Sequence, residues 1–363
     1  MTCGYVSLRH AGEYVIAHSS TRSAFVALPL LLVLGACGES PAPEAAPPFA
    51  DTLAETVRPP VRDSALDAAL AAVVAGFDGE VGIHAYFPDS RRFAAFNDDR
   101  RFVLASVYKL AVAYAALGGG LRPTDTLEVT VGDLAPGETP LRAGARATVA
   151  QLVERSLAHS DNTASDVLLR TLGGPGEVMR QLTALGIRDL TVDRSMREVF
   201  ADWRGIPERD GLQAWTLSEF ESRSAGVAAA ARAEAQAAFA DDERDAGTAK
   251  AVAELLAAIH AGIGLDDAGR ELMSSSLRRS DTGPNRIRAG VPPGTVVADK
   301  TGTLGPLTHD AGIITLPGGL GDVVLVVLVR SNAPVAARER IIAAAARAVW
   351  EHATADARTV PAP

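Results

Sequence analysis

Strand-like segments lie at both ends of this sequence, and helical patterns fill most of the chain between them. Because sequence-distant strands are best buried in a shared sheet, we expect one sheet built from both chain ends, with the helical middle as an inserted subdomain. A cleft at the junction is the expected ligand site. The predicted strands are 80–87, 92–96, 295–298, 311–316 and 323–329, and helices are predicted at 64–75 and 334–350 and through most of 106–277.

The composition is that of an ordinary globular protein. Of the 363 residues, 47% are hydrophobic and 22% are charged, which provides enough apolar surface for a buried core. The net charge is -9, and Lys and Arg form no cluster interleaved with aromatic residues, so nucleic acid is not an expected partner. The two cysteines, Cys3 and Cys37, both lie near the N-terminus. We therefore expect no disulfide in the folded domain.

An apolar run at 24–34 follows Arg22 and has the features of an export signal, being too short to cross a bilayer. It leads into LGAC at 34–37, which resembles a bacterial lipobox; an ordinary signal peptide with an incidental cysteine is the alternative. We expect a lipoprotein anchored to the cell membrane or outer membrane and facing the periplasm or exterior. The predicted segments are a signal peptide at 1–37 with Cys37 lipidated, a Pro/Ala-rich linker at 38–62 and a folded domain at 63–355.

Lysine is scarce, since Lys109, Lys250 and Lys300 are the only lysines among 35 basic residues. Unlike arginine, lysine loses its proton at accessible pH when it is desolvated or placed beside another cation, and it can then act as a base. Ser106 lies three residues before Lys109 at the expected start of an apolar helix. Helical spacing places the hydroxyl and the amine on one face, close enough for proton transfer. The motif predicts a serine nucleophile with a lysine neighbour.

Two further motifs follow in order: SDN at 160–162 and KTGT at 300–303, the latter at the end of a predicted strand. Glycine at 302 removes a side chain where a substrate must lie along the strand edge. Each motif alone is a weak signal, because short combinations of this kind arise by chance in a chain of this length. Their order and separation make the combination specific.

Together these motifs resemble the marker set of class A β-lactamases and penicillin-binding proteins. The resemblance extends to FVLASVYKL, SLAHSDNTASDVLL, DERDAGTAKAV and TGPNRIRAGVPPGTVVADKTGT, and it covers most of the chain from about 64 to 350. It implies an α/β fold (an α+β sandwich) of the β-lactamase/transpeptidase type. In this fold an antiparallel sheet from both chain ends is flanked by helices and carries an all-helical subdomain, here at about 104–280 with an insertion at about 200–241.

The resemblance implies a division of roles among four catalytic residues. Ser106 is the nucleophile that becomes acylated, and Lys109 is its activating neighbour. Ser160 relays a proton to the leaving lactam nitrogen, and Lys300 lowers the pKa of that hydroxyl. The backbone amides of Ser106 and Thr303 would form the oxyanion hole.

Further residues are expected from the resemblance to bind substrate. Asn162 would hold the amide side chain, and Thr301 and Thr303 would contact the substrate carboxylate and backbone beside Gly302. Arg286 would add positive charge near Lys300, although a surface arginine is an equal alternative. No cofactor is implied, and the seven histidines show no ligand spacing, so no metal is expected.

The resemblance weakens at the base that activates water to hydrolyse the acyl-enzyme. Class A enzymes hold the hydrolytic water with a glutamate and an asparagine in the pattern E-x-x-L-N, a little over thirty residues after SDN. A direct alignment puts Met196 at the glutamate, and methionine accepts no proton. A two-residue bulge puts Glu198 there instead, with Asp202 in place of the asparagine. We take Glu198 as the candidate deacylation base.

The expected activity is hydrolysis of a small-molecule β-lactam by a monomer that contacts a membrane only through its lipid anchor. Two alternatives stay open: a DD-peptidase or transpeptidase-like penicillin-binding protein with slow deacylation, and a non-catalytic penicillin-binding or sensor lipoprotein. Arg194 and Asp245 resemble the ion pair that closes the family's loop, and the long segment between them predicts an extra helix at 217–239. The family's aromatic gatekeeper position falls near Ala135.

Overall fold

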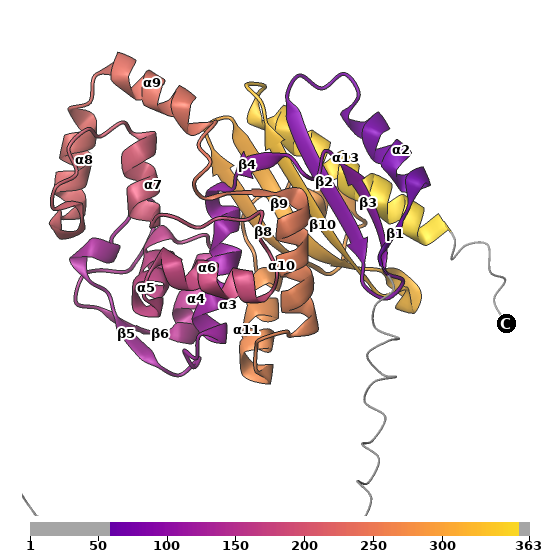
Figure 1. The fold of residues 1–363 in the computed structure, drawn as a ribbon, viewed down its shortest axis with the longest axis horizontal. Coiled ribbons are helices and arrows are strands. Elements are labelled where there is room, and N and C mark those ends of the chain that lie inside the picture. Colours follow the sequence, from indigo (N-terminus) through magenta and orange to yellow (C-terminus); the bar gives the residue numbers. More distant parts are fainter. Residues whose placement is uncertain (1–58, 356–363) are drawn as a thin grey trace, which may run out of the picture. The chain divides into compact units, whose positions relative to one another are not determined.

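A six-stranded sheet built from both ends of the chain forms the centre of the computed structural model, which describes residues 59–355 (Figure 1). All neighbouring strands are antiparallel except the first pair, β1 and β3. The predicted fold class is therefore confirmed. From one edge to the other the strands are β1 (Val61–Arg62), β3 (Arg92–Phe96), β2 (Glu80–Phe87), β10 (Asp322–Arg330), β9 (Leu307–Thr315) and β8 (Val297–Leu304).

The ends of two predicted segments differ in the structure. The linker was expected to reach residue 62, but Val61 belongs to the sheet, where its N–H donates to the carbonyl of Arg91 at 2.8 Å. The strand expected at 295–298 instead runs to Leu304 as β8, through the KTG motif, because its polar side chains are buried with polar partners. The predicted signal peptide, Cys37 and most of the linker lie outside the described residues.

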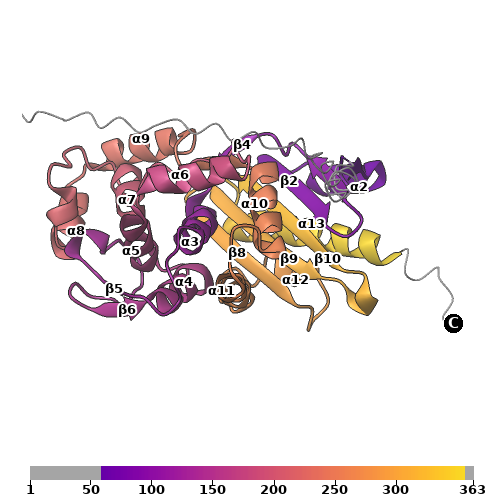
Figure 2. The same cartoon turned by 60° about the horizontal axis from the view of Figure 1, so that its bottom comes forward.

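Helices cover both faces of the sheet and enclose two apolar cores (Figures 1 and 2). Along β10, Val324, Val326 and Leu328 point into one core and Leu325, Val327 and Val329 into the other. This period of two explains why the whole strand is apolar. The covering helices are α2 (Ser64–Val74) and α13 (Val335–Ala355) on one face and α10 (Ala249–Ala261) and α11 (Asp267–Arg278) on the other.

One short antiparallel pair, β4 (Arg101–Val103) with β7 (Ala246–Thr248), brackets the helices between residues 109 and 239, whereas α10 and α11, which the predicted range of about 104–280 also includes, pack on the sheet. The extra helix predicted at 217–239 is two helices, because the chain turns at Gly226. The predicted Arg194–Asp245 ion pair is present at 2.6 Å. The remaining helices are α3 (Lys109–Gly118), α4 (Val149–Ala158), α5 (Asn162–Leu172), α6 (Pro175–Ala184), α7 (Met196–Trp203), α8 (Leu217–Ala225), α9 (Ala229–Phe239) and the short α12 (Ile287–Gly290).

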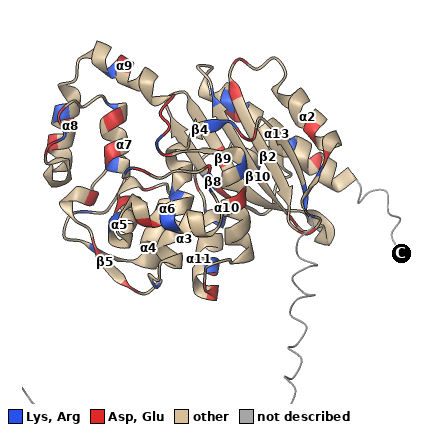
Figure 3. Cartoon of the chain, viewed as in Figure 1, with Lys and Arg blue, Asp and Glu red and all other residues tan. Residues whose placement is uncertain are grey.

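Acidic and basic residues are interspersed over the helices and loops in the view of Figure 3, whereas the central strands carry few of them. This distribution agrees with a sheet buried on both faces by apolar side chains. Within residues 59–355, no helix has the length and apolar character needed to cross a membrane.

Candidate active site

Ser106 lines a cavity of about 200 Å³ where the edge of the sheet meets the helical subdomain. The wall comes from β8, from the segment before α3, from the start of α5, from α7 and from the loop at 135–139. The structure thus brings the three sequence motifs to one place. The lining residues are Ala105, Ser106, Gly137, Glu138, His159, Ser160, Asn162, Met196, Phe200, Thr303 and Leu304.

Ser106 is held in a short 3-10 helix, Ala105–Tyr108, and β8 passes directly beside it. A Cβ atom at Gly302 would lie 2.7 Å from the Leu104 carbonyl oxygen and 3.3 Å from the Ser106 amide nitrogen. Only glycine therefore lets the strand approach this closely. Ala105 has a φ of 47°, in the left-handed region that residues with a Cβ seldom occupy. Strain of this kind is typical of functional sites.

Lys109 is fully buried at the start of α3 and donates from Nζ to three oxygen atoms. Two belong to Ser160, the carbonyl at 2.5 Å and Oγ at 3.3 Å, and the third is Asn162 Oδ1 at 2.6 Å. Burial, and then the charge of Lys300, hold the pKa of Lys109 well below its usual value. A lowered pKa favours the neutral amine, the form of lysine that can accept a proton.

Ser160 lies between the two buried lysines of the site. Lys300 Nζ donates to Ser160 Oγ at 3.0 Å and to the Thr301 carbonyl at 2.8 Å. Burial lowers the pKa of Lys300 to about 7, although the nearby carboxyls of Asp299 and Asp310 act in the opposite direction. Ser160 itself has a φ of 56°, which again places strain at the site. The hydroxyl therefore has two amines within reach for exchanging a proton.

Arg286 is a buried side chain of the site and not a surface arginine, since only 5% of it is exposed. Its guanidinium donates to Thr303 Oγ1 at 2.7 Å and to the His309 carbonyl at 2.9 Å, and it pairs with Glu339 at 3.2 Å. Thr301, the other threonine of the motif, shares a hydrogen bond of 2.6 Å with Thr282 through its hydroxyl. Positive charge and hydroxyl groups thus gather along β8, as a carboxylate site requires.

Asn162 joins the catalytic lysine to the loop at 135–139. Its Oδ1 accepts from Lys109, and its Nδ2 donates to the Pro136 carbonyl at 2.6 Å. The neighbouring Asp161 is a buried structural carboxylate, because it caps α5 through the Ala164 amide and pairs with Arg155 at 2.8 Å. Ala135, near the family's gatekeeper position, is buried and does not line the cavity, so it offers no aromatic ring for stacking on a substrate.

Helix α7 places Met196 and Phe200, not a carboxylate, in the wall of the cavity. Asp166 on α5 orients the start of this helix, accepting from the amides of Met196 at 2.7 Å and Arg197 at 2.9 Å. Burial raises the pKa of Asp166 to about 8, against the effect of these two amides. Direct alignment put Met196 at the position of the family's glutamate, and in the structure Met196 is a residue of α7 that lines the cavity.

The structure places Glu198, the candidate deacylation base, outside the wall of the Ser106 cavity. Glu198 Oε2 accepts from the Ser195 amide at 2.8 Å and from Ser195 Oγ at 2.9 Å, which closes a capping box at the start of α7. It lines a separate cavity of about 340 Å³. Asp202 lies there too, paired with Arg194, Arg209 and Arg244. The capping box fixes the start of α7 at Met196 and holds the Glu198 carboxylate against Ser195.

Two side chains and one contact of the site were not predicted from the sequence. Glu138 reaches the cavity from an exposed loop, for which the sequence carries no signal. Asp166 lies on the buried face of α5, and a buried carboxylate indicates a specific hydrogen-bond or ion-pair partner. His159 pairs with Asp281 through Nδ1 at 2.7 Å at the rim of the cavity, a contact across the chain that only the fold reveals.

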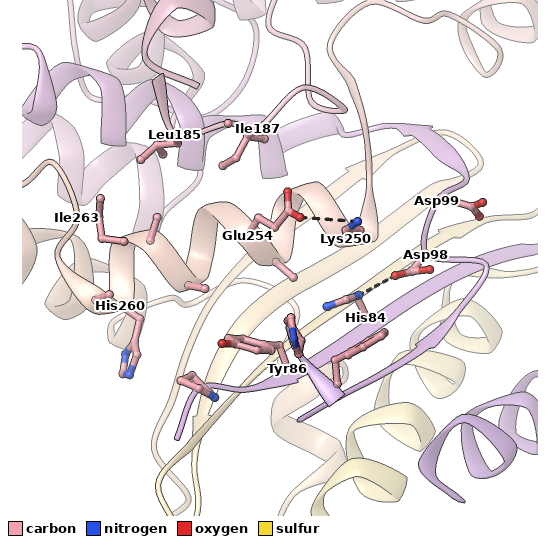
Figure 4. Close-up of a pocket in the computed structure, with 18 of the residues that line it drawn as sticks. His84, Tyr86, Asp98, Asp99, Leu185, Ile187, Lys250, Glu254, His260 and Ile263 are labelled. Atoms are coloured by element: carbon pink, nitrogen blue, oxygen red, sulfur yellow. Dashed lines mark hydrogen bonds and ion pairs between the residues drawn. The ribbon is translucent and has the colours of Figure 1, made fainter. Parts of the chain in front are cut away.

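A larger cavity of about 1260 Å³ lies elsewhere, between α10 and the strands β2 and β3 (Figure 4). His84 pairs with Asp98 at 2.7 Å there, and Lys250 faces Glu254 at 4.0 Å. It shares no lining residue with the Ser106 cavity. The third lysine of the chain therefore lies outside the candidate active site. Among residues 59–355 no cluster of His, Cys, Asp and Glu suited to a metal ion is found.

A serine at a strained turn, two buried lysines and a second serine between them define a serine hydrolase that moves protons through lysine. The profile of the "Beta-lactamase enzyme family" matches residues 65–353. The chain belongs to this family, and the predicted resemblance is confirmed.

Individual relatives agree with the family profile. The chain is 28% identical to the carbapenem-hydrolyzing β-lactamase KPC of Klebsiella oxytoca, over 76% of this chain and 84% of that protein. It is 24% identical to β-lactamase VEB-1 of Pseudomonas aeruginosa, over 77% and 87%. Among solved structures, a β-lactamase from Xanthomonas campestris superposes with a TM-score of 0.63 at 25% identity, covering 79% of this chain and 97% of that one.

Proposed function

We propose that this protein hydrolyses β-lactams through an ester formed on Ser106. The observation that carries the proposal is the position of Ser160, whose hydroxyl lies 3.3 Å from Lys109 Nζ and 3.0 Å from Lys300 Nζ. Both amines are buried and have lowered pKa values. Such a hydroxyl can pass one proton between nucleophile and leaving group without a histidine.

In acylation, Lys109, whose lowered pKa favours the neutral amine, takes the proton of Ser106 as Oγ attacks the lactam carbonyl. The backbone amides of Ser106 and Thr303, which both line the cavity, stabilise the charge that develops on the carbonyl oxygen. The proton then passes through Ser160 to the lactam nitrogen as the carbon–nitrogen bond breaks. The substrate carboxylate lies along β8, beside Lys300 and Thr303.

In deacylation, water attacks the ester and a base must take its proton. Neither Met196 nor Phe200, the two residues that α7 contributes to the cavity, accepts a proton. Lys109 is neutral again once it has passed its proton on, and it is the base we assign to this step. We expect the ester to be hydrolysed more slowly than it forms. The same observation supports a second candidate function, a penicillin-binding DD-peptidase.

One mass-spectrometric experiment tests both the acylation and the deacylation step. The purified protein is mixed with a chromogenic cephalosporin, and the acylation of Ser106 and the release of the product are followed together. We expect covalent modification that Ser106→Ala abolishes, followed by slow turnover. A Ser106→Ala variant that still hydrolyses the cephalosporin would overturn the proposal, and an ester that never turns over would leave the DD-peptidase as the function.

Two substitutions on α7 test the assignment of the second half-reaction. Glu198→Gln is expected to leave the lifetime of the ester unchanged, because Glu198 caps the helix away from Ser106. Met196→Glu places a carboxylate in the cavity wall and is expected to shorten that lifetime tenfold or more, since a general base contributes about 10²–10⁴ in rate. Met196→Gln is the uncharged control. An ester that persists in Glu198→Gln but not in the unmodified protein would restore Glu198 as the base.

We further propose that the protein is an exported, monomeric lipoprotein anchored through Cys37. Support comes from the apolar run at 24–34 and the LGAC sequence that follows it. Incorporation of a labelled fatty acid that is lost in Cys37→Ala is the expected result. A labelled Cys37→Ala protein would contradict the anchor.

A further inference from the structure

Glu138 is an exposed carboxylate at the mouth of the Ser106 cavity. Within residues 59–355 it takes part in no ion pair or hydrogen bond, whereas the carboxylates around it are engaged. Arg142, the arginine nearest in sequence, donates instead to the carbonyls of Thr139 and Leu141. Glu138 therefore presents an unneutralised negative charge to whatever enters the cavity.

The loop that carries Glu138 lies against Asn162, on the side of the cavity where the substrate's acylamino group is expected. Asn162 Nδ2 donates to the Pro136 carbonyl at 2.6 Å, and a Cβ atom at Gly137 would lie 2.9 Å from the same nitrogen. This contact ties the loop to the start of α5. An acyl side chain held by Asn162 is thus brought next to Glu138.

The charge on the opposite wall has the other sign. Along β8, Arg286 donates to Thr303 Oγ1 at 2.7 Å, and Lys300 lies one hydrogen bond from Ser160. The remaining ionisable lining residue, His159, is already paired with Asp281. Lys300 and Arg286, the latter paired with Glu339, thus place basic groups behind β8, whereas Glu138 is the acidic residue that lines the cavity. A ligand of complementary charge carries a carboxylate at one end and a cation at the other.

We propose that Glu138 selects substrates whose acyl side chain carries an ammonium group. The inference rests on the proposed function, because it names the substrate class of the same site. An ammonium in the acyl side chain meets the Glu138 carboxylate while the substrate carboxylate lies along β8. Since Glu138 is exposed, the pair is screened by solvent, and the preference is expected to be several-fold and not absolute.

Ampicillin and benzylpenicillin test this proposal, because they differ only by the α-amino group of the side chain. The second-order rate constant for acylation of the full-length protein is measured for both at pH 6, by competition with a chromogenic cephalosporin, so that slow deacylation does not enter. The ratio of the ampicillin to the benzylpenicillin constant is expected to fall about two- to fivefold in Glu138→Gln. The ratio is expected to fall further in Glu138→Lys. In the unmodified protein the ratio should decline as salt is added, because salt screens the charge of Glu138.

Glu234→Gln is the matched control, since it makes the same charge change on α9 without lining the cavity. It is expected to leave the ratio unchanged. A ratio that stays constant across the Glu138 variants while both penicillins acylate Ser106 overturns this inference and leaves the proposed function standing. If neither penicillin acylates the protein, the proposed function and the inference both fail.

Discussion

Lys300 is fully buried, and its burial lowers the pKa of the amine to about 7, inside the working range of an enzyme. Its positive charge faces Ser160 and lies beside β8, where we propose that the substrate carboxylate binds. We expect the acylation rate constant to fall as the pH rises through about 7, because the amine then loses its proton. The pH dependence of the second-order acylation constant measures this. A Lys300→Arg variant that is folded by circular dichroism should lack the fall, since arginine stays charged. An identical fall in that variant would contradict the assignment.

His309 couples stability to pH because one of its two ring hydrogen bonds requires the neutral imidazole. Nδ1 accepts from the Val329 amide at 3.1 Å, so Nε2 donates to the Val103 carbonyl at 2.9 Å. Burial lowers the pKa of the ring from 6.5 to about 4. The folded state therefore resists a proton that the unfolded chain accepts. The free energy of unfolding should decline by about 3 kcal/mol as the pH falls from 6.5 to 4.

Denaturant unfolding at several pH values measures this decline. In His309→Asn, whose side chain does not titrate, the decline between these pH values should be smaller by about 3 kcal/mol. Equal slopes for the two proteins would show that other groups cause the acid sensitivity.

At the level of elements, the close contact between β8 and the segment carrying Ser106 depends on Gly302. In Gly302→Ala, the new methyl group would meet the Leu104 carbonyl at 2.7 Å, and the strand would have to move away. We expect acylation to slow by about 10²-fold, because a shift of about 1 Å is enough to misplace the oxyanion site. Rapid-mixing kinetics with a chromogenic cephalosporin measures it. An unchanged acylation rate in a folded variant would show that β8 can move away without disturbing the oxyanion site.

Arg197 ties three elements together from the buried side of α7. Its guanidinium donates to the carbonyls of Val131 at 3.0 Å, Leu134 at 2.5 Å and Trp215, the last of which belongs to the inserted segment. Arg197→Met would leave these carbonyls without their donor, and we expect a loss of about 3 kcal/mol in unfolding free energy. Chemical denaturation measures the loss. Arg347→Met, an exposed change, is expected to cost less than about 0.5 kcal/mol. Similar costs for both variants would contradict the buried role.

Helix α7 also shows where sequence reasoning failed and how it could have succeeded. Alignment with a family pattern moved Glu198 into the catalytic position. Yet Ser195 and Glu198 form the S-x-x-E pattern of a capping box, which predicts a helix start and a carboxylate turned back on it. The local pattern was the better guide. Glu138 was not accessible to any such reasoning, because an exposed loop residue reaches the cavity only through the fold.

At the level of the whole molecule, the sheet with strands from both chain ends was predictable, because apolar runs with turns between them mark the strands. The extent of β8 was not, since the polar residues Asp299 and Lys300 interrupt the apolar pattern. Each is buried with a specific partner, Arg288 for Asp299 and Ser160 for Lys300. Pairing of this kind is a tertiary property. The three motifs, in contrast, carried enough order and spacing to predict that their residues meet at one cavity.

The two cores share the central strand, so the domain should unfold as one unit. Leu70 lies in the core under α2 and α13, and Leu110 lies in the core of the helical side, both fully buried. Leu70→Ala and Leu110→Ala should each cost about 2–5 kcal/mol, and the double variant should lose their sum to within about 0.5 kcal/mol. Denaturant unfolding followed by fluorescence and by circular dichroism measures this. Two separate transitions would contradict a single cooperative unit.

The central strand β10 lies next to β2, although the two are made at opposite ends of translation. The hairpin of β2 and β3 leaves the ribosome early and keeps an unpaired edge until the last part of the chain arrives. Pairing across such a sequence distance is also slow. Yield during expression should therefore depend on how well chaperones shield that nascent edge, as much as on the stability of the finished domain.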